Sequence, residues 1–292
     1  MANKEFKTLD EQIEILEARG LSIPDKQQAK EFLKRNNYYR VSGYSLTLRN
    51  HDVFEEAATF QNIIDIYEFD HELRHVLLRY LEAIEVSVKS VYAHEFTRVY
   101  GPNGYLDASN YTNPQRHKEI MDKAEDQKGK RLAHEAYLKH FVEDLQQDVP
   151  LWAYVDLLTI SDISFLYSIS NQQIKDAVAA ELNLKPNGSK LLGRFMHSMT
   201  IIRNLCAHGS RLYNRLFEQK PWLNKKELAL LRVEPDGTVD NAHLFGFILL
   251  MRRLLATTEF SLLKTDLVDL KRKYPFVSMR YYGFPENWAS VL

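Results

Sequence analysis

The sequence contains a single cysteine, Cys206, which excludes an internal disulfide and favours a reducing compartment. It also lacks an excess of charge, with 38 basic residues against 39 acidic ones. A protein that binds nucleic acid through its overall positive charge is therefore excluded, and any site for a polyanion must be local. Internal repeats, low-complexity tracts and runs of alternating strands are missing too. The 45% apolar content of the 292 residues predicts a packed protein throughout.

No long apolar run is free of charge. The most apolar segment, residues 244–263, carries Arg252 and Arg253 in its middle, where a charge is costly at the centre of a bilayer. The start of the chain, MANKEFKTLD, is polar and lacks the apolar segment of a secretory signal. We therefore expect a cytoplasmic protein with no membrane contact and a buried core helix over 243–264.

Helical periodicity dominates the remainder of the sequence. After Thr59, a plausible N-cap, apolar residues recur every three, four or seven positions, and neither proline nor glycine interrupts them before Gly101. This pattern predicts one long helix over 60–98, or two nearly continuous ones, as the spine of the fold. Further helices are predicted over 8–19, 26–36, 115–147 (with breaks), 171–182, 191–215 and 225–232, and turn-rich loops over 101–117, 183–190 and 234–241. The sequence thus predicts an all-α fold, with an N-terminal helical extension over 1–58 and a helical domain over 59–292.

The segment RNLCAHGSRLYNR, residues 203–215, stands out because it combines a histidine with several cations on a predicted helix. At about 100° per residue, one face of that helix is an apolar stripe facing the core. A second stripe lies almost opposite, provided that the helix continues through Gly209. The core stripe consists of Leu192, Phe195, Met199, Ile202 and Cys206, and the polar stripe of Asn204, His208, Arg211 and Arg215.

Arg203 and His208 cannot point the same way on one straight helix, because five residues separate them by about 140°. Either the helix breaks near Gly209, or the two side chains meet through a neighbouring element, including the same motif of a second subunit. Histidine can exchange a proton near neutral pH, and arginine can bind phosphate oxygens with two donors. Together they could cleave RNA without a metal, with Asn204 orienting one of the groups. The alternative is an ordinary solvated helix face, on which such residues are common.

The same motif resembles the R-N-x-C-A-H motif of Abi-like proteins of the AbiD and AbiF type, a bacterial abortive-infection family with a HEPN domain. Residues 16–44, 66–90, 149–167 and 281–288 resemble other blocks of that family, in the expected order. One departure lies in the third of these blocks, where the chain has Asp156 and TISD (residues 159–162) and the family more often has a glutamate followed by a phenylalanine–glycine pair.

The resemblance implies a HEPN-type helical bundle that pairs two motifs across a homodimer. It implies metal-independent endoribonuclease activity, in which attack by a 2′-hydroxyl leaves a 2′,3′-cyclic phosphate, with Arg203 and His208 catalytic and Asn204 supporting. It further implies a role in phage defence or as a toxin held silent by a cognate RNA or protein. The alternative function is a non-catalytic helical module of such a system that binds RNA or a partner.

Other residues offer RNA contacts or structural roles. Arg211 and Arg215 on the polar stripe are predicted to bind RNA. Arg40, within NNYYRVSGY, is the best N-terminal prediction of an RNA contact, because arginine interleaved with tyrosines can bind phosphate beside stacked bases. The competing and favoured interpretation of this segment is an aromatic cluster that docks the N-terminal helices onto the bundle. Asp70 and Arg74 are most simply a local ion pair.

No metal or cofactor is predicted. Glu82 and Glu85 share a helix face and could act as acid–base groups or ligands, but no histidine follows at E-x-x-H spacing, which favours surface or packing carboxylates. In HEAYLKH, residues 134–140, the second histidine comes too late for a zinc-protease helix. No glycine-rich phosphate loop is found.

Overall fold

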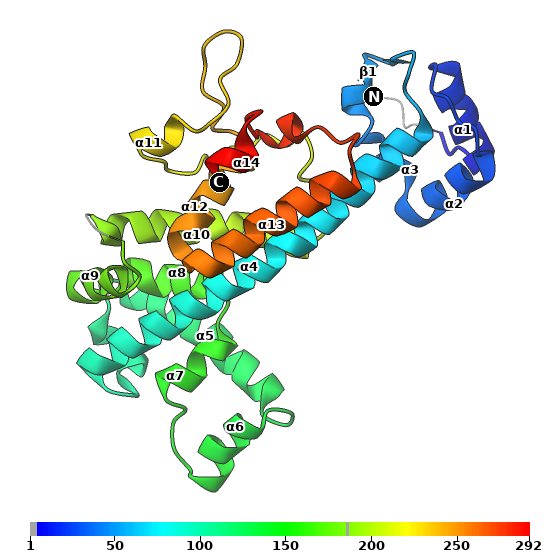
Figure 1. Cartoon of the computed structure of the whole chain (residues 1–292). Coiled ribbons are helices and arrows are strands. Elements are labelled where there is room, and N and C mark those ends of the chain that lie inside the picture. The colour runs from blue at the N-terminus through cyan, green and yellow to red at the C-terminus, as the bar shows by residue number, and fades with distance from the viewer. Residues whose placement is uncertain (1–4, 185–186) are drawn as a thin grey trace.

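The computed structural model describes residues 5–184 and 187–292 and is built almost entirely of helices (Figure 1). Among these residues the only named strands are β1 (Arg49–Asn50) and β2 (Val53–Phe54), which form a small antiparallel hairpin. The prediction of an all-α fold is confirmed. Residues 1–4 of the polar start and residues 185–186 of the predicted 183–190 loop lie outside the described residues.

The spine of the fold is α4 (Phe60–Tyr100), a single continuous helix about 60 Å long at 1.5 Å per residue. Thr59 is its N-cap: the Thr59 hydroxyl accepts the backbone N–H of Asn62, whose side chain accepts the N–H of Thr59 in return. The helix ends at Gly101, which has a positive φ of 78°. The predicted long helix and its cap are therefore confirmed.

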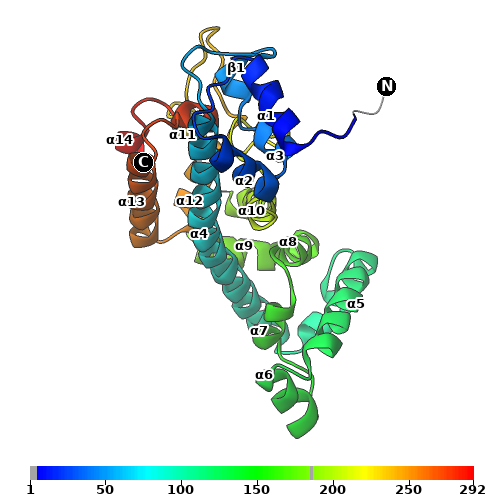
Figure 2. The ribbon, with the colours of Figure 1, turned by 90° about the vertical axis from the view of Figure 1, so that its right-hand side faces the viewer.

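Two groups of helices cover α4. On one side α13 (Thr257–Lys273) packs along it (Figures 1 and 2). On another side lie α8 (Ile160–Ile169), α9 (Gln172–Glu181) and α10 (Gly188–Ala207), and α12 (Phe245–Leu254) contacts α4, α10 and α13. The predicted 171–182 helix is confirmed as α9.

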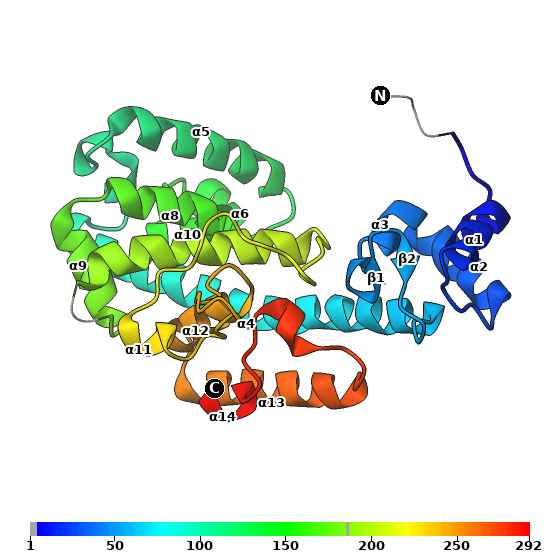
Figure 3. The ribbon, with the colours of Figure 1, turned by 90° about the horizontal axis from the view of Figure 1, so that it is seen from above.

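The N-terminal elements gather around the first turns of α4, at the end toward which α10 runs (Figure 3). They are α1 (Leu9–Ala18), α2 (Lys26–Asn36), α3 (Tyr38–Ser42) and the hairpin. The first two match the predicted helices. The N–H of Phe60 donates to the carbonyl of Ser22 at 2.9 Å, which ties this segment to the start of α4.

At the far end of α4, the predicted 115–147 helix consists of separate pieces. These are α5 (Pro114–Arg131), α6 (Ala136–Lys139) and a π-helical turn, His140–Asp144. After Pro150 the chain forms α7 (Leu151–Tyr154) and a 3-10 turn, Val155–Leu157. Two further short helices are α11 (Lys225–Leu228), which follows α10 in the sequence, and α14 (Trp288–Val291), which follows α13.

The prediction of one helix over 243–264 was wrong in its continuity. The segment forms α12 and α13, which part at Leu255 and Ala256 because both have extended backbones. The N–H of Ala256 donates to the Glu259 carboxylate at 3.0 Å, which starts the second helix. The core position was correct, since residues 245–251 are all buried. Within the described part of the chain, no helix combines the length and apolar character needed to cross a bilayer.

Candidate functional site

The motif helix α10 ends at Ala207, not near Arg215 as the sequence predicted. His208 is its C-cap and Gly209 follows in the left-handed region, with φ of 62°. The N–H of Ser210 donates to the carbonyl of Leu205 at 2.9 Å, and the N–H of Gly209 to that of Cys206 at 3.1 Å. This pair of bonds is the Schellman arrangement, which satisfies the last helical carbonyls and turns the chain away from the helix axis. A break near Gly209, one of the two predicted solutions, is present.

The break removes Arg211 and Arg215 from the face of α10. The guanidinium of Arg211 is half-buried and donates to the backbone carbonyls of Gly43 and Tyr213, both at 3.0 Å. Arg215 is also half-buried and donates to the carbonyl of Arg211 at 3.4 Å. The predicted cationic stripe therefore does not form on the helix, and these two arginines bind protein backbone. The core stripe that ends at Cys206 is confirmed, because each of its members is buried.

The side chains of Arg203 and His208 lie at the surface near the end of α10. His208 is exposed, and within residues 5–184 and 187–292 no group forms a hydrogen bond with its ring. Arg203 is 38% exposed in its side chain, and its guanidinium donates to the amide oxygen of Asn204 at 3.4 Å. No hydrogen bond joins Arg203 to His208 in the described structure. The three residues thus offer a donor fork and an unpaired imidazole on one stretch of helix.

Glu85 of α4 is the partner of Arg203 that sequence reasoning missed. One oxygen of its carboxylate lies 3.5 Å from the Nε of Arg203, and the other lies 2.8 Å from the Nζ of Lys89. The helical spacing of four predicts the pair with Lys89. The pair with Arg203 joins residues far apart in the sequence, so no local pattern signals it. In this arrangement Glu85 bridges two cations, which agrees with the packing role that the sequence favours for it.

Behind the motif, Asp70 and Arg74 form the local ion pair on α4 that the sequence predicted, and the pair is buried. Both residues are almost inaccessible to solvent. The Asp70 carboxylate accepts the backbone N–H groups of Leu212 at 3.2 Å and Tyr213 at 2.8 Å, in addition to a bond from Arg74. Arg74 also lies 3.5 Å from the carbonyl of Ser210. The chain that follows His208 is therefore fixed to α4 through its backbone.

Two tyrosine hydroxyls complete the surroundings of Asp70. Tyr44 donates to it at 2.8 Å and Tyr282 at 3.0 Å. Burial, and secondarily the negative charge of Asp70, raises the pKa of both tyrosines well above the ordinary value. The hydroxyls consequently remain protonated and act as donors. Tyr44 packs against Tyr67 and Tyr213, which confirms the aromatic docking cluster favoured for the NNYYRVSGY segment.

Arg40 approaches the motif from the N-terminal elements. Its guanidinium donates to the carbonyl of Gly209, directly after His208, and to the hydroxyl of Tyr67 at 3.2 Å. Arg40 is nevertheless an exposed residue, so its side chain binds the end of α10 and also faces solvent. The structure thus places Arg40 at the end of α10, where it contacts the residue that follows His208. The sequence gives no indication of this proximity.

Cys206 has no chemical role in this arrangement. It is buried, and burial raises the pKa of its thiol to about 12, with Arg74 opposing the shift. The thiol therefore stays protonated at neutral pH and packs as a small apolar group.

The fold and the site together define an all-α protein in which a basic helix end is held by residues from both halves of the chain. A family model described as Abi-like protein matches residues 31–214, which is more than half of the chain. The chain belongs to the Abi-like family. The match includes Arg40, Asp70 and the motif from Arg203 to His208, whereas Tyr282 lies outside it. No curated protein and no solved structure gives a significant match.

Proposed function

We infer that this Abi-like protein is a HEPN-type endoribonuclease that cleaves RNA without a metal, as a homodimer, in abortive infection of phage-infected cells. Membership of the Abi-like family supports the role in abortive infection. The observation that carries the proposal is that one helix end, held in place from behind, presents both the exposed, unpaired imidazole of His208 and the half-exposed guanidinium of Arg203. A solvent-facing acid–base group and a cation are the two kinds of group that phosphoryl transfer uses.

The proposed reaction has three parts. The 2′-hydroxyl of a nucleotide loses its proton to one His208 and attacks the adjacent phosphorus. The bond from phosphorus to the 5′-oxygen of the next nucleotide breaks, and that oxygen takes a proton from the second His208. Arg203 stabilises the additional negative charge on the phosphoryl oxygens, and Asn204 orients its guanidinium. The products are a 2′,3′-cyclic phosphate and a free 5′-hydroxyl.

We infer the need for two copies from the geometry of α10 and from the number of proton-transfer groups that the reaction uses. The helix is continuous up to Ala207, so the side chains of Arg203 and His208 leave it about 140° apart. One chain presents one histidine, whereas the reaction uses a base and an acid. A second copy related by two-fold symmetry would supply the second histidine. A cognate antitoxin, RNA or protein, would keep such an enzyme silent by covering this surface.

The test is cleavage of labelled RNA by the purified protein in the presence of a chelator. We expect the parent protein to cleave and the Arg203→Ala and His208→Ala variants to lose at least about 100-fold in rate, the usual size of a general acid–base contribution. Matched controls lie on the same helix: Arg194→Ala and His197→Ala replace exposed residues of the same types outside the motif. Equal cleavage by the parent and all four variants would refute the assignment.

The alternative, a binding module without catalysis, predicts a different result. RNA would bind tightly and remain intact with the parent and every variant. The dimer is tested separately by light scattering of the purified protein, and by mixing the Arg203→Ala and His208→Ala variants. A paired site predicts that the mixture differs in activity from either variant alone, whereas two independent sites predict the average of the two.

A further inference from the structure

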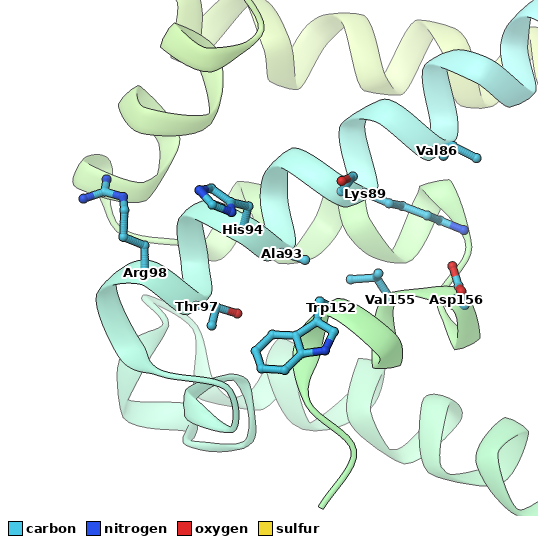
Figure 4. Close-up of a pocket in the computed structure, with 10 residues that line it drawn as sticks. Val86, Lys89, Ala93, His94, Thr97, Arg98, Trp152, Val155 and Asp156 are labelled. Carbon is cyan, nitrogen blue, oxygen red and sulfur yellow. The ribbon is translucent and has the colours of Figure 1, made fainter. Parts of the chain in front are cut away.

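A cavity of about 550 Å³ opens on α4, next to the segment that carries Glu85 (Figure 4). Its floor is apolar and is formed by Ala93 of α4, Val155 of the 3-10 turn and the indole of Trp152 of α7. Lys89 and Asp156 lie at one end of the cavity, and Arg98 and His94 at the other (Figure 4). The cavity therefore combines a flat aromatic surface with charged groups at both ends.

Trp152 is unusual for a residue of its type because it is 56% exposed, whereas Trp288 is 8% exposed. An exposed indole inside a concavity leaves a large apolar face in water, where it offers a platform for a planar ligand. The volume of the cavity is sufficient for a nucleobase, since small-molecule pockets start at about 300 Å³. Base stacking on such a ring tolerates different sequences, because every base has a π-face.

The cavity is connected to the motif through shared ion pairs. Lys89, at its mouth, donates to the same Glu85 carboxylate that accompanies Arg203. Residues 85 and 93 of α4 are about 12 Å apart along the helix axis, at 1.5 Å per residue. An RNA strand with one phosphate at Arg203 would thus have its next phosphate near Lys89, and the base of the following nucleotide would lie over Trp152.

The ends of the cavity carry polar groups that an apolar ligand would leave without partners. Lys89 is 13% exposed and pairs with Glu85, and Arg98 is 56% exposed and pairs with Glu95 at 2.6 Å, so each cation must exchange a carboxylate for a phosphate in order to bind RNA. In the described structure Asp156 has no ion-pair partner within 4.0 Å, so its carboxylate is available to accept a hydrogen bond from an amino group of a base.

We propose that this cavity, with Trp152 as its platform, holds one unpaired nucleobase of the RNA strand, one nucleotide beyond the phosphate bound at Arg203. Lys89 contacts the intervening phosphate, and Asp156 selects a base that carries an amino group over uracil. This inference rests on the proposed function for the location of the scissile phosphate, but the binding of the base itself does not require cleavage.

The experiment measures binding of single-stranded RNA to the full chain carrying His208→Ala, so that cleavage does not interfere. Trp152→Ala in that background is expected to weaken binding by about 10-fold or more, from the loss of one stacked base. The matched control is Trp222→Ala, which removes another exposed tryptophan, 40% exposed, from a different part of the surface. Trp152→Phe keeps an aromatic face and is expected to retain most of the affinity.

A scan of abasic sites along the RNA sharpens the assignment. One position is expected to lose as much affinity as Trp152→Ala does, and to lose no more when both changes are combined, as for two partners of one contact. Asp156→Asn is expected to reduce the preference at that position for an amino-bearing base over uracil.

The outcomes separate the two proposals. RNA binding that depends on Trp152, in a protein whose unmutated form does not cleave, keeps the base site and refutes the nuclease. Cleavage by a Trp152→Ala protein with unchanged affinity refutes the base site and keeps the nuclease. A Trp152→Ala variant that turns a dimer into a monomer would overturn the inference, because the indole would then belong to an interface between copies of this chain.

Discussion

The backbone N–H of Tyr213 donates a 2.8 Å hydrogen bond to the buried carboxylate of Asp70, a residue 143 positions earlier in the chain. Leu212 donates in the same way at 3.2 Å. Because both donors are backbone groups, the path of the chain beyond His208 is fixed independently of the side chains at these two positions. A charged acceptor inside the protein also makes these bonds stronger than neutral ones.

Asp70→Asn should lower the free energy of unfolding by about 3–5 kcal/mol, because it leaves the buried charge of Arg74 without its partner. Urea unfolding measures this change. The control is Asp65→Asn, on the same helix, where the carboxylate is half-buried and accepts one bond from Gln61 at 2.7 Å. If both variants lose the same stability, the network around Asp70 has no special importance.

Glu85→Gln should separate RNA affinity from turnover. Removal of the carboxylate beside Arg203 and Lys89 frees two cations, so RNA should bind more tightly and with a steeper dependence on salt. The orientation of Arg203 is weakened at the same time, so kcat should fall. Kinetics at several salt concentrations check both effects. Glu82→Gln, an exposed neighbour on α4, serves as the control and should leave kcat unchanged.

Gly209→Ala should lower stability by about 1–3 kcal/mol, because alanine adopts the left-handed conformation at a cost and the added methyl group would lie 3.5 Å from the Arg40 guanidinium. RNA cleavage should fall as the end of α10 shifts. Gly129→Ala is the matched control, since Gly129 lies within α5 with open space around it, and it should be neutral or stabilising. Thermal melting of the two variants provides the comparison.

The Cys206 thiol should resist modification in the folded protein. Burial raises the pKa of this thiol from the ordinary 9.0 to about 12, so at pH 8 its thiolate is far rarer than that of an exposed cysteine. Since the folded-state pKa is the higher one, the protonated thiol stabilises the fold below pH 9, and this contribution is lost as the pH rises through about 12.

A thiol reagent should react with Cys206 slowly in buffer and rapidly in urea. Because the chain has one cysteine, the whole signal reports this site. Rapid reaction in buffer would contradict the described packing around α10.

Regular periodicity made the helices predictable. The apolar repeat and the Thr59 cap predict α4 within a few residues, and the stripe from Leu192 to Cys206 identifies the buried face of α10. The end of α10 was missed because a glycine within a helical pattern can be tolerated, or can end the helix in a Schellman turn. Here the helix ends, and Arg40, from a distant part of the chain, binds the carbonyl of Gly209, a contact that the local pattern does not indicate.

The support of the site could not be predicted for the same reason. Arg203, Asn204 and His208 are recognised by their motif, but their partners are joined by tertiary contacts alone. Glu85 of α4 pairs with Arg203 of α10. The sequence indicates only a local i, i+4 pair between Asp70 and Arg74, because it does not reveal that both residues are buried. Sequence spacing carries no information about such contacts, whereas it specifies helix faces directly.

The position of Tyr282 has a consequence for synthesis of the protein. Its hydroxyl donates to Asp70, yet it is translated long after the motif and after α4. A nascent chain on the ribosome therefore contains Arg203 and His208 before the support behind them is complete. The finished geometry arises only once the segment around Tyr282 has emerged from the exit tunnel. If the proposed nuclease is toxic to its host, this order of assembly predicts that translation products ending before Tyr282 are less active than the whole chain.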